Sequence, residues 1–82
     1  MVWHVYILLC ADGSLYTGST NNLEKRFLDH QKGKGGKYTR SHKPVRIVYT
    51  EELETKSEAL KKEIRIKALN RINKIKLIDS KI

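Results

Sequence analysis

Four side chains suited to phosphate chemistry lie within one short stretch of the sequence. They are Tyr6, Tyr16, Arg26 and His30. The arginine offers a planar, permanently charged fork to phosphate oxygens, and the histidine accepts or relays a proton near neutral pH. The two tyrosine hydroxyls can approach each other if their segments pair as strands joined by a short turn. A charge clamp and groups that activate water are parts that a phosphodiester hydrolase needs.

A fifth candidate, Glu63, lies far along the chain, in a segment where the capping-box pattern from Thr55 to Glu58 predicts the start of a helix. Helical spacing places the apolar residues of this helix in an arc of Leu60, Ile64 and Ala68, with Ala59 and Ile66 beside it. Glu63 projects from within that arc, which is an unusual place for a carboxylate. A hard divalent cation prefers oxygen ligands and keeps several waters, so Glu63 is a candidate for holding one such ion.

The segment that carries the tyrosines has the pattern of a β-hairpin. Trp3–Cys10 is rich in β-branched and aromatic residues, and both of its alternating faces are largely apolar, so we expect a central strand. Asp12 and Gly13 form a hairpin-turn signal. The returning strand is expected over Leu15–Thr17 and to end at Gly18, where a positive φ or a close backbone approach is typical of glycine.

The rest of the chain predicts helices and one further strand. In order, we expect a helix from Leu23 to His30, a loop over Gln31–Lys43, a strand over Val45–Thr50, a helix from Lys56 to about Leu69 and a shorter helix over Ile72–Ile78. The loop has three glycines, five basic residues and no apolar periodicity, and its glycines would let the backbone approach a phosphate. At 82 residues the chain has room for a single domain, residues 1–82.

The charge distribution favours a polyanionic partner. The net charge is +8, and residues 1–24 contain no Lys or Arg, whereas residues 25–46 contain eight with Asp29 as their one acidic neighbour. A second set of eight lies between residues 61 and 81. Such clusters suit nucleic acid, because each neutralised phosphate releases counterions. The loop residues expected to bind the nucleic-acid backbone are Lys32, Lys34, Lys37, Arg40 and Lys43.

The composition excludes several other classes of protein. The single cysteine, Cys10, leaves no partner for an internal disulfide framework or a thiolate zinc site. It favours a reducing, cytoplasmic setting. The apolar run over residues 5–10 is too short for a membrane span or a signal-peptide core, so we expect no membrane partner.

Each candidate also has a purely structural explanation when it is taken alone. A tyrosine in a strand is usually a core or boundary residue, and Arg26 by itself is a solvated helix cation. His30, near the end of its helix, would complement the helix dipole. Glu63 would pair with Lys67 one turn later. The functional interpretation therefore depends on the order and spacing of the whole set.

That order and spacing resemble the GIY-YIG nuclease superfamily. The first motif of the family corresponds to His4–Tyr6, and the second corresponds to Tyr16–Gly18, which begins after nine intervening residues and precedes a helix that carries Arg26. The resemblance covers nearly the whole chain and is closest to the small stand-alone bacterial members. It implies an α/β (α+β) domain, with a small three-stranded antiparallel sheet flanked by helices in the order β-β-α-β-α-α.

The resemblance also implies roles for the four N-terminal candidates. Tyr6 and Tyr16 would position or activate the attacking water, with Tyr16 the better candidate for general base. Arg26 would stabilise the charge that develops on the phosphate. His30 matches a position where the family has His or Tyr.

The resemblance assigns the metal to the second half of the chain. Glu63 matches the single metal-binding glutamate of the family, so one Mg²⁺ or Mn²⁺ ion is implied. Many members carry an asparagine after the glutamate helix, for which Asn73 is the nearest candidate and Asn70 the next. Ser19 stands where repair-type members have a lysine, so that cationic group is absent here.

The expected function is a metal-dependent DNA endonuclease that nicks one strand per encounter with little sequence specificity. One site and one metal disfavour simultaneous cleavage of both strands by a monomer. We expect a monomer or weak oligomer. Branched, damaged or single-stranded DNA are the preferred substrates on this view, which suits DNA repair. Two alternatives stay open: a nucleic-acid-binding module of the same fold without turnover, and a protein-interaction domain for an acidic partner. Charge leaves DNA and RNA undecided, and the resemblance favours DNA.

Overall fold

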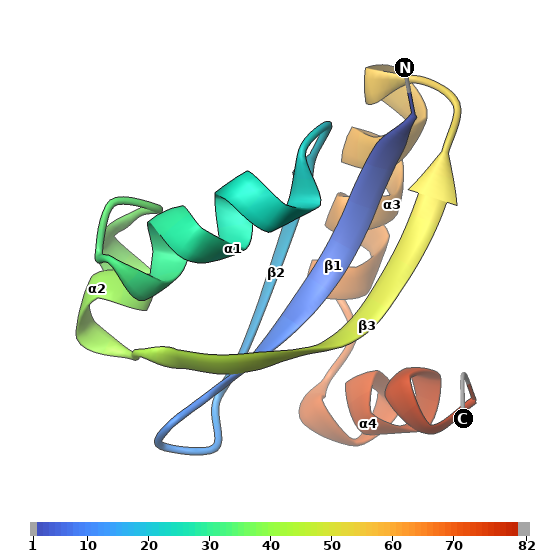
Figure 1. The fold of residues 1–82 in the computed structure, drawn as a ribbon. Helices are drawn as coiled ribbons and strands as arrows, with labels where there is room; N and C mark the ends of the chain where they lie inside the picture. The colour runs from blue at the N-terminus through green and yellow to red at the C-terminus, as the bar shows by residue number, and fades with distance from the viewer. Residues whose placement is uncertain (1, 81–82) are drawn as a thin grey trace.

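A computed structural model describes residues 2–80 of the protein as a β-sheet with helices on both faces (Figure 1). Its elements are β1 (Trp3–Cys10), β2 (Leu15–Thr20), α1 (Leu23–Gln31), α2 (Lys37–Ser41), β3 (Pro44–Leu53), α3 (Lys56–Lys67) and α4 (Arg71–Asp79). The three-stranded antiparallel sheet and α+β architecture predicted from the sequence are confirmed. No helix in this described part of the chain is long and apolar enough to span a membrane.

The strand β1 lies at the centre of the sheet, as expected, with the order β2-β1-β3. Tyr6 on β1 lies opposite Gly18 on β2, and Leu8 lies opposite Tyr16. Directly opposed residues of an antiparallel pair point to the same face of a sheet, so both tyrosines share the face that α1 covers. The next residue along β1, Ile7, points to the other face, where it packs in the cluster that contains Ala59 and Ile66 of α3.

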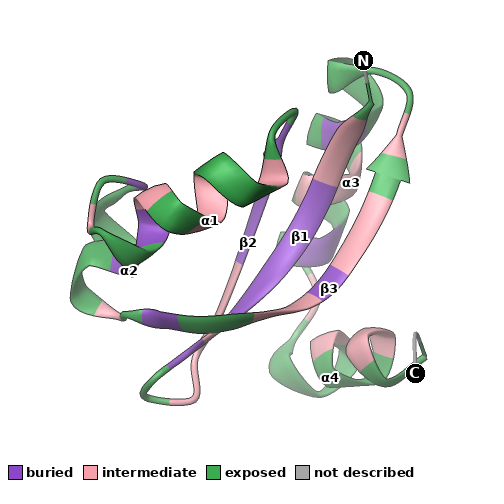
Figure 2. Ribbon diagram, viewed as in Figure 1, coloured by how far each residue is buried: buried purple, intermediate pink, exposed green. Residues whose placement is uncertain are grey.

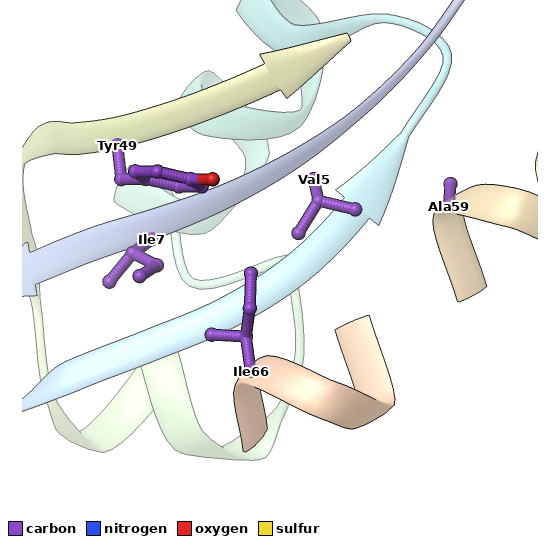
Figure 3. Close-up of a cluster of buried hydrophobic side chains, with 5 residues drawn as sticks. All are labelled: Val5, Ile7, Tyr49, Ala59 and Ile66. Atoms are coloured by element: carbon purple, nitrogen blue, oxygen red, sulfur yellow. The ribbon is translucent and has the colours of Figure 1, made fainter. Parts of the chain in front are cut away.

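The apolar core fills the space between the sheet and α3. Its buried members are Val5, Ile7, Tyr49, Ala59 and Ile66 (Figure 3). Burying a large apolar side chain of this kind contributes about 1.5–3 kcal/mol to folding relative to leaving it exposed. Burial is concentrated on β1, whereas α4 has no buried residue (Figure 2). The core thus holds β1 in place, and α4 lies at the periphery.

Side-chain caps set the start of three helices. The capping residues are Asn22 for α1, Thr55 for α3 and Asn70 for α4. In each case the side-chain oxygen accepts a hydrogen bond from the backbone N–H three residues later, an arrangement worth about 1 kcal/mol. The helix start that the capping-box pattern at Thr55 predicted is therefore confirmed. The cap at Asn70 explains why the helical pattern breaks there and restarts at Arg71.

The expectation of a plain loop over Gln31–Lys43 is wrong, because the short helix α2 lies within it. Its Thr39 side chain is buried, and the Thr39 hydroxyl lies 2.8 Å from Nδ1 of His30 on α1. Gly36, at the start of α2, has φ 140°, a conformation that strongly favours glycine. The buried contact that anchors α2 is polar, so no apolar periodicity in the sequence predicts the helix.

Two strands are also longer than expected. Gly18 does not end β2, which continues to Thr20, and β3 extends to Leu53. The close approach expected at Gly18 is present: the ring of Tyr6 lies over it, and a Cβ at this position would overlap that ring. Gly18 therefore makes room for Tyr6 within a continuous strand.

The apolar arc expected on α3 is wrong as well. Leu60 and Ile64 are 42% and 68% exposed, whereas Ala59 and Ile66 are buried against the sheet. The buried stripe runs through Ala59, Glu63 and Ile66, at the i, i+4, i+7 spacing of one helix face. The small side chain of Ala59 lets α3 approach the sheet closely, so the helix is turned away from its larger aliphatic residues. Glu63 lies within the inward-facing stripe.

Candidate active site

The sheet and α1 bring together the four N-terminal candidates, hereafter the Tyr–Arg–His cluster: Tyr6, Tyr16, Arg26 and His30. The ring centroids of Tyr6 and Tyr16 are 6.4 Å apart, and those of Tyr16 and His30 are 5.0 Å apart. The ring of His30 also meets the Tyr6 ring edge-on at 5.9 Å. This proximity arises because β1 and β2 pair in register while α1 lies over the tyrosine-bearing face.

His30 is fully buried and has a partner for each of its ring nitrogens. Nε2 lies 2.8 Å from the Tyr6 hydroxyl, and Nδ1 lies 2.8 Å from the Thr39 hydroxyl. Burial, aided by the positive charge of Arg26, lowers the pKa of His30 to about 4. The ring is therefore neutral at pH 7, with one nitrogen donating and the other accepting. Because the ring is neutral, His30 does not complement the dipole of α1 by its charge. Its two hydrogen bonds instead link β1 to α2.

Tyr6 is also buried and keeps its proton. Burial raises the pKa of the Tyr6 hydroxyl to about 12, although Arg26 opposes this shift by hydrogen bonding and by its charge. The hydroxyl is accordingly neutral at pH 7 and bonded to His30. Tyr16, in contrast, is only half-buried. Of the two phenols, Tyr16 is the one that an incoming water or phosphate can reach.

Arg26 is half-buried on α1 and is aimed at the loop that precedes α2. Its Nη2 donates a hydrogen bond of 3.0 Å to the carbonyl oxygen of Gly35. Its positive charge also acts on Tyr6, where it opposes the rise in the pKa of the hydroxyl. Because a guanidinium has five N–H donors in a fixed plane, Arg26 retains donors for a phosphate oxygen. The contact with Gly35 fixes the direction in which that fork points.

Glu63 lies on the opposite side of the edge strand β2 from the tyrosines. Its Oε1 accepts a hydrogen bond of 2.6 Å from the hydroxyl of Ser19 on β2, and its Oε2 lies 2.7 Å from Nζ of Lys67. The charge of Glu63 contributes to the raised pKa of Tyr6, so the carboxylate acts electrostatically on the cluster. Glu63 thus faces the sheet, as expected, and it also forms the ion pair with Lys67 that the spacing allowed.

A single hard cation at Glu63 would have that one carboxylate as its protein ligand. Among residues 2–80, no group of three or more His, Cys, Asp or Glu side chains is arranged to hold a metal. Mg²⁺ is commonly held by one or two carboxylates together with waters and substrate phosphate oxygens. Glu63 would supply the one protein carboxylate, and the side chain of Lys67, which is 51% exposed, has room to move away from it.

The remaining predicted site residues lie on the surface. All five residues predicted to bind the nucleic-acid backbone are exposed: Lys32, Lys34, Lys37, Arg40 and Lys43. Asn73 is exposed on α4, and within the described residues its side chain makes no hydrogen bond to the cluster. Asn70 serves as the α4 cap. The structure therefore brings the four N-terminal candidates together, places Glu63 on the other side of β2, and leaves both asparagines outside that group.

Sequence reasoning missed three residues that support the cluster. Thr39 bonds the buried ring of His30, and Ser19 bonds Glu63. Gly35 packs so closely against His30 that a Cβ there would overlap the imidazole. The available signal was the three glycines of the loop, Gly33, Gly35 and Gly36, which we interpreted as letting the backbone approach a phosphate. In the structure, Gly35 instead provides space for the His30 ring.

Comparisons with known proteins show the family to which the chain belongs. The GIY-YIG catalytic domain family matches residues 2–76. A UPF0213 protein from Staphylococcus saprophyticus is 52% identical over 75 residues, or 92% of each chain, and one from Clostridium perfringens is 56% identical over 78 residues, or 95% of this chain and 84% of the relative. The solution NMR structure of a UPF0213 protein from Bacillus halodurans, 44% identical, has a TM-score of 0.64 and covers 99% of this chain and 86% of that one. The protein therefore belongs to the GIY-YIG family, a nuclease superfamily.

Proposed function

We propose that this protein is a metal-dependent DNA endonuclease that hydrolyses one phosphodiester bond per encounter. The observation that carries the proposal is the position of Arg26 close to Tyr6, whose ring centroid lies 6.4 Å from that of Tyr16, with Glu63 across the edge strand. A phosphoryl-transfer site must stabilise charge on the phosphate and orient a nucleophile. The cluster contains groups for both tasks within one small region.

Each member of the cluster has a role that follows from its surroundings. Arg26 binds the scissile phosphate and stabilises the charge that develops there. Tyr16, the accessible phenol, orients or deprotonates the attacking water. Tyr6 retains its proton and holds its hydroxyl in place through His30, which acts as a positioning residue.

The metal requirement is assigned to Glu63. One Mg²⁺ or Mn²⁺ ion bound there would supply Lewis-acid stabilisation of a phosphate oxygen. Ser19 orients the Glu63 carboxylate by donating to Oε1. The remaining ligands would be waters and the phosphate itself.

The DNA backbone would follow the exposed basic residues of the segment that contains α2. Such contacts position a protein on nucleic acid without reading its sequence, so we expect little sequence specificity. One active site per chain favours nicking over double-strand cleavage, by a monomer or weak oligomer. The free thiol of Cys10 suits a cytoplasmic location.

The test is nicking of supercoiled plasmid in Mg²⁺ or Mn²⁺ and in EDTA. We expect relaxed circles from the wild type with metal, and none from Tyr16→Phe, Arg26→Ala or Glu63→Ala. The matched control is Glu54→Ala, which removes an exposed carboxylate elsewhere and should cut like the wild type. If Glu63→Ala cuts as fast as the wild type, the assignment of the metal to Glu63 is wrong. DNA binding that persists in EDTA without any cleavage in metal, on structured DNA as well, would favour the binding module.

A further inference from the structure

Aromatic rings continue outward from the cluster onto α2. Tyr38 stacks on Tyr16, with centroids 5.7 Å apart and planes at 27°, and His42 stacks on Tyr38 at 4.2 Å and 8°. We call these three rings the aromatic ladder: Tyr16, Tyr38 and His42. Tyr16 belongs to both the ladder and the Tyr–Arg–His cluster. The ladder therefore leads directly from the candidate active site to the outer surface of the protein.

The ladder is held in a fixed orientation. Nδ1 of His42 lies 3.0 Å from the carbonyl oxygen of Tyr38, and Nε2 lies 3.5 Å from the carboxylate of Asp12 in the β1–β2 turn. The helix that carries Tyr38 is itself anchored through the buried contact of Thr39 with His30. Ring planes that are fixed before binding lose little conformational entropy when a flat ligand stacks on them.

The surroundings of the ladder suit a nucleic acid. Tyr38 is 39% exposed, and it is not part of the buried core. Its neighbours on α2, Lys37 and Arg40, are exposed cations, and residues 30–50 contain no Asp or Glu. The carboxylate that does contact the ladder, Asp12, is paired with His42. Exposed aromatic rings among cations are the combination with which proteins bind single strands, because bases stack on the rings while cations hold the phosphates.

We propose that the aromatic ladder stacks an unpaired base of the DNA strand whose phosphate is held at Arg26. This inference rests on the proposed function for its ligand and specifies the substrate as DNA with an unpaired nucleotide beside the scissile bond. A base inside a duplex already has neighbours on both of its faces, so it has no free face to offer. Because Tyr16 is shared, a base on the ladder belongs to a nucleotide close to the phosphate at the cluster.

The test separates stacking from phosphate binding in EDTA, where metal-dependent cleavage is absent. Two labelled single strands of equal length are compared by fluorescence anisotropy, one with normal bases and one composed of abasic sites. Both have the same phosphate charge. Stacking of one base predicts that the wild type binds the normal strand about 5- to 100-fold more tightly than the abasic strand.

Four variants complete the experiment. Tyr38→Leu and, independently, His42→Leu should reduce the preference for the normal strand, whereas Tyr38→Phe should preserve it. Lys37→Ala should weaken the binding of both strands by the same factor, because it removes only a phosphate contact. Circular dichroism verifies that each variant is folded, and His42→Leu replaces Tyr38→Leu if the latter does not fold.

Equal affinity of the wild type for the two strands, or no binding of either, would overturn the inference. An undiminished base preference in folded Tyr38→Leu and His42→Leu would do the same. The plasmid assay reports on the proposed function separately. If the wild type does not nick plasmid but prefers the normal strand, the proposed nuclease activity is wrong and the base-stacking role of the ladder stands. If it nicks plasmid but shows no preference for the normal strand, the nuclease activity stands and the base-stacking role is wrong.

Discussion

The two faces of β1 are stabilised by different interactions, although the residues concerned are neighbours in the sequence. Ile7 points into an apolar core formed with α3, where Ile66 and Ala59 are also buried. Tyr6, one residue earlier, points into an interior of hydroxyl and imidazole groups under α1, where its partner is His30. Both faces are closed to solvent. They differ in what holds them together.

The apolar face is stabilised by burial, which has no direction and depends on area. The polar face is stabilised by a few hydrogen bonds, and each one that is lost leaves a buried group without a partner. A site that must place an arginine and two phenols accurately is better built on directional contacts. The side of the sheet that packs on α3 therefore contributes most of the stability, whereas the side under α1 fixes the geometry of the candidate site.

The largest effect on stability should come from the apolar face. Ile7→Ala removes a side chain with no exposure and should lower the free energy of unfolding by about 2–5 kcal/mol. The control Ile64→Ala, at a position that is 68% exposed, should change it by less than about 0.5 kcal/mol. Urea unfolding followed by circular dichroism measures both. Equal losses would mean that α3 packs with a different face.

The largest effect on activity should come from the polar face. Arg26→Ala should lower the nicking rate about 10²–10³-fold, because it removes a positioned donor to the phosphate. Lys25→Ala removes the same charge from the exposed side of α1, where Lys25 pairs with Asp29, and should leave the rate nearly unchanged. Initial rates on supercoiled plasmid decide between them. Similar losses of nicking rate in both variants would show that the rate depends on net charge and not on the position of the Arg26 guanidinium.

The sequence was sufficient where local patterns and strong propensities agreed. Alternation along Trp3–Cys10 correctly put Tyr6 and Ile7 on opposite faces, and the capping signal at Thr55 correctly started α3. The spacing of Tyr6, Tyr16 and the helix with Arg26 predicted a cluster that the fold does form. These features depend on neighbours in sequence or on a short hairpin.

The features that could not be predicted depend on tertiary contacts. The helix α2 is held by Thr39 against His30, and nothing in the local pattern of the loop distinguishes that threonine from any other. On α3, Leu60 and Ile64 are more hydrophobic than Ala59, and only the close approach of the helix to the sheet selects the smaller residue. Small size and polarity count as weak signals in a sequence, and here they determine how both helices are placed.

Acidification should weaken the polar face specifically. The pKa of His30 is about 4 in the folded protein, below its ordinary value of 6.5. Between these two values the unfolded chain binds a proton at His30 that the folded protein does not, so stability falls as the pH is lowered from about 6.5 to 4. The loss should reach at most about 3 kcal/mol. Urea unfolding of the wild type and of His30→Gln across this range should show a smaller pH dependence in the variant, and identical slopes would contradict a buried neutral ring.

The smallest predicted effect compares the same substitution on the two faces. Thr39→Val removes a hydroxyl bonded to His30 and leaves a buried ring nitrogen without its partner, so it should cost about 1–3 kcal/mol. Thr17 on β2 is also buried, but it lies opposite Ile7 on the apolar face, and its hydroxyl has no hydrogen-bond partner among the described residues. Thr17→Val should therefore be neutral or stabilising.

Differential scanning calorimetry of the two valine variants measures this contrast directly. A lower melting temperature for Thr39→Val, beside an equal or higher one for Thr17→Val, would follow from directional bonding on one face and burial on the other. A larger loss in Thr17→Val would instead mean that its hydroxyl has a bound water as partner, because a buried hydroxyl needs one. The apolar face would then also depend on a specific polar contact, and the two sides of β1 would differ less in the interactions that stabilise them.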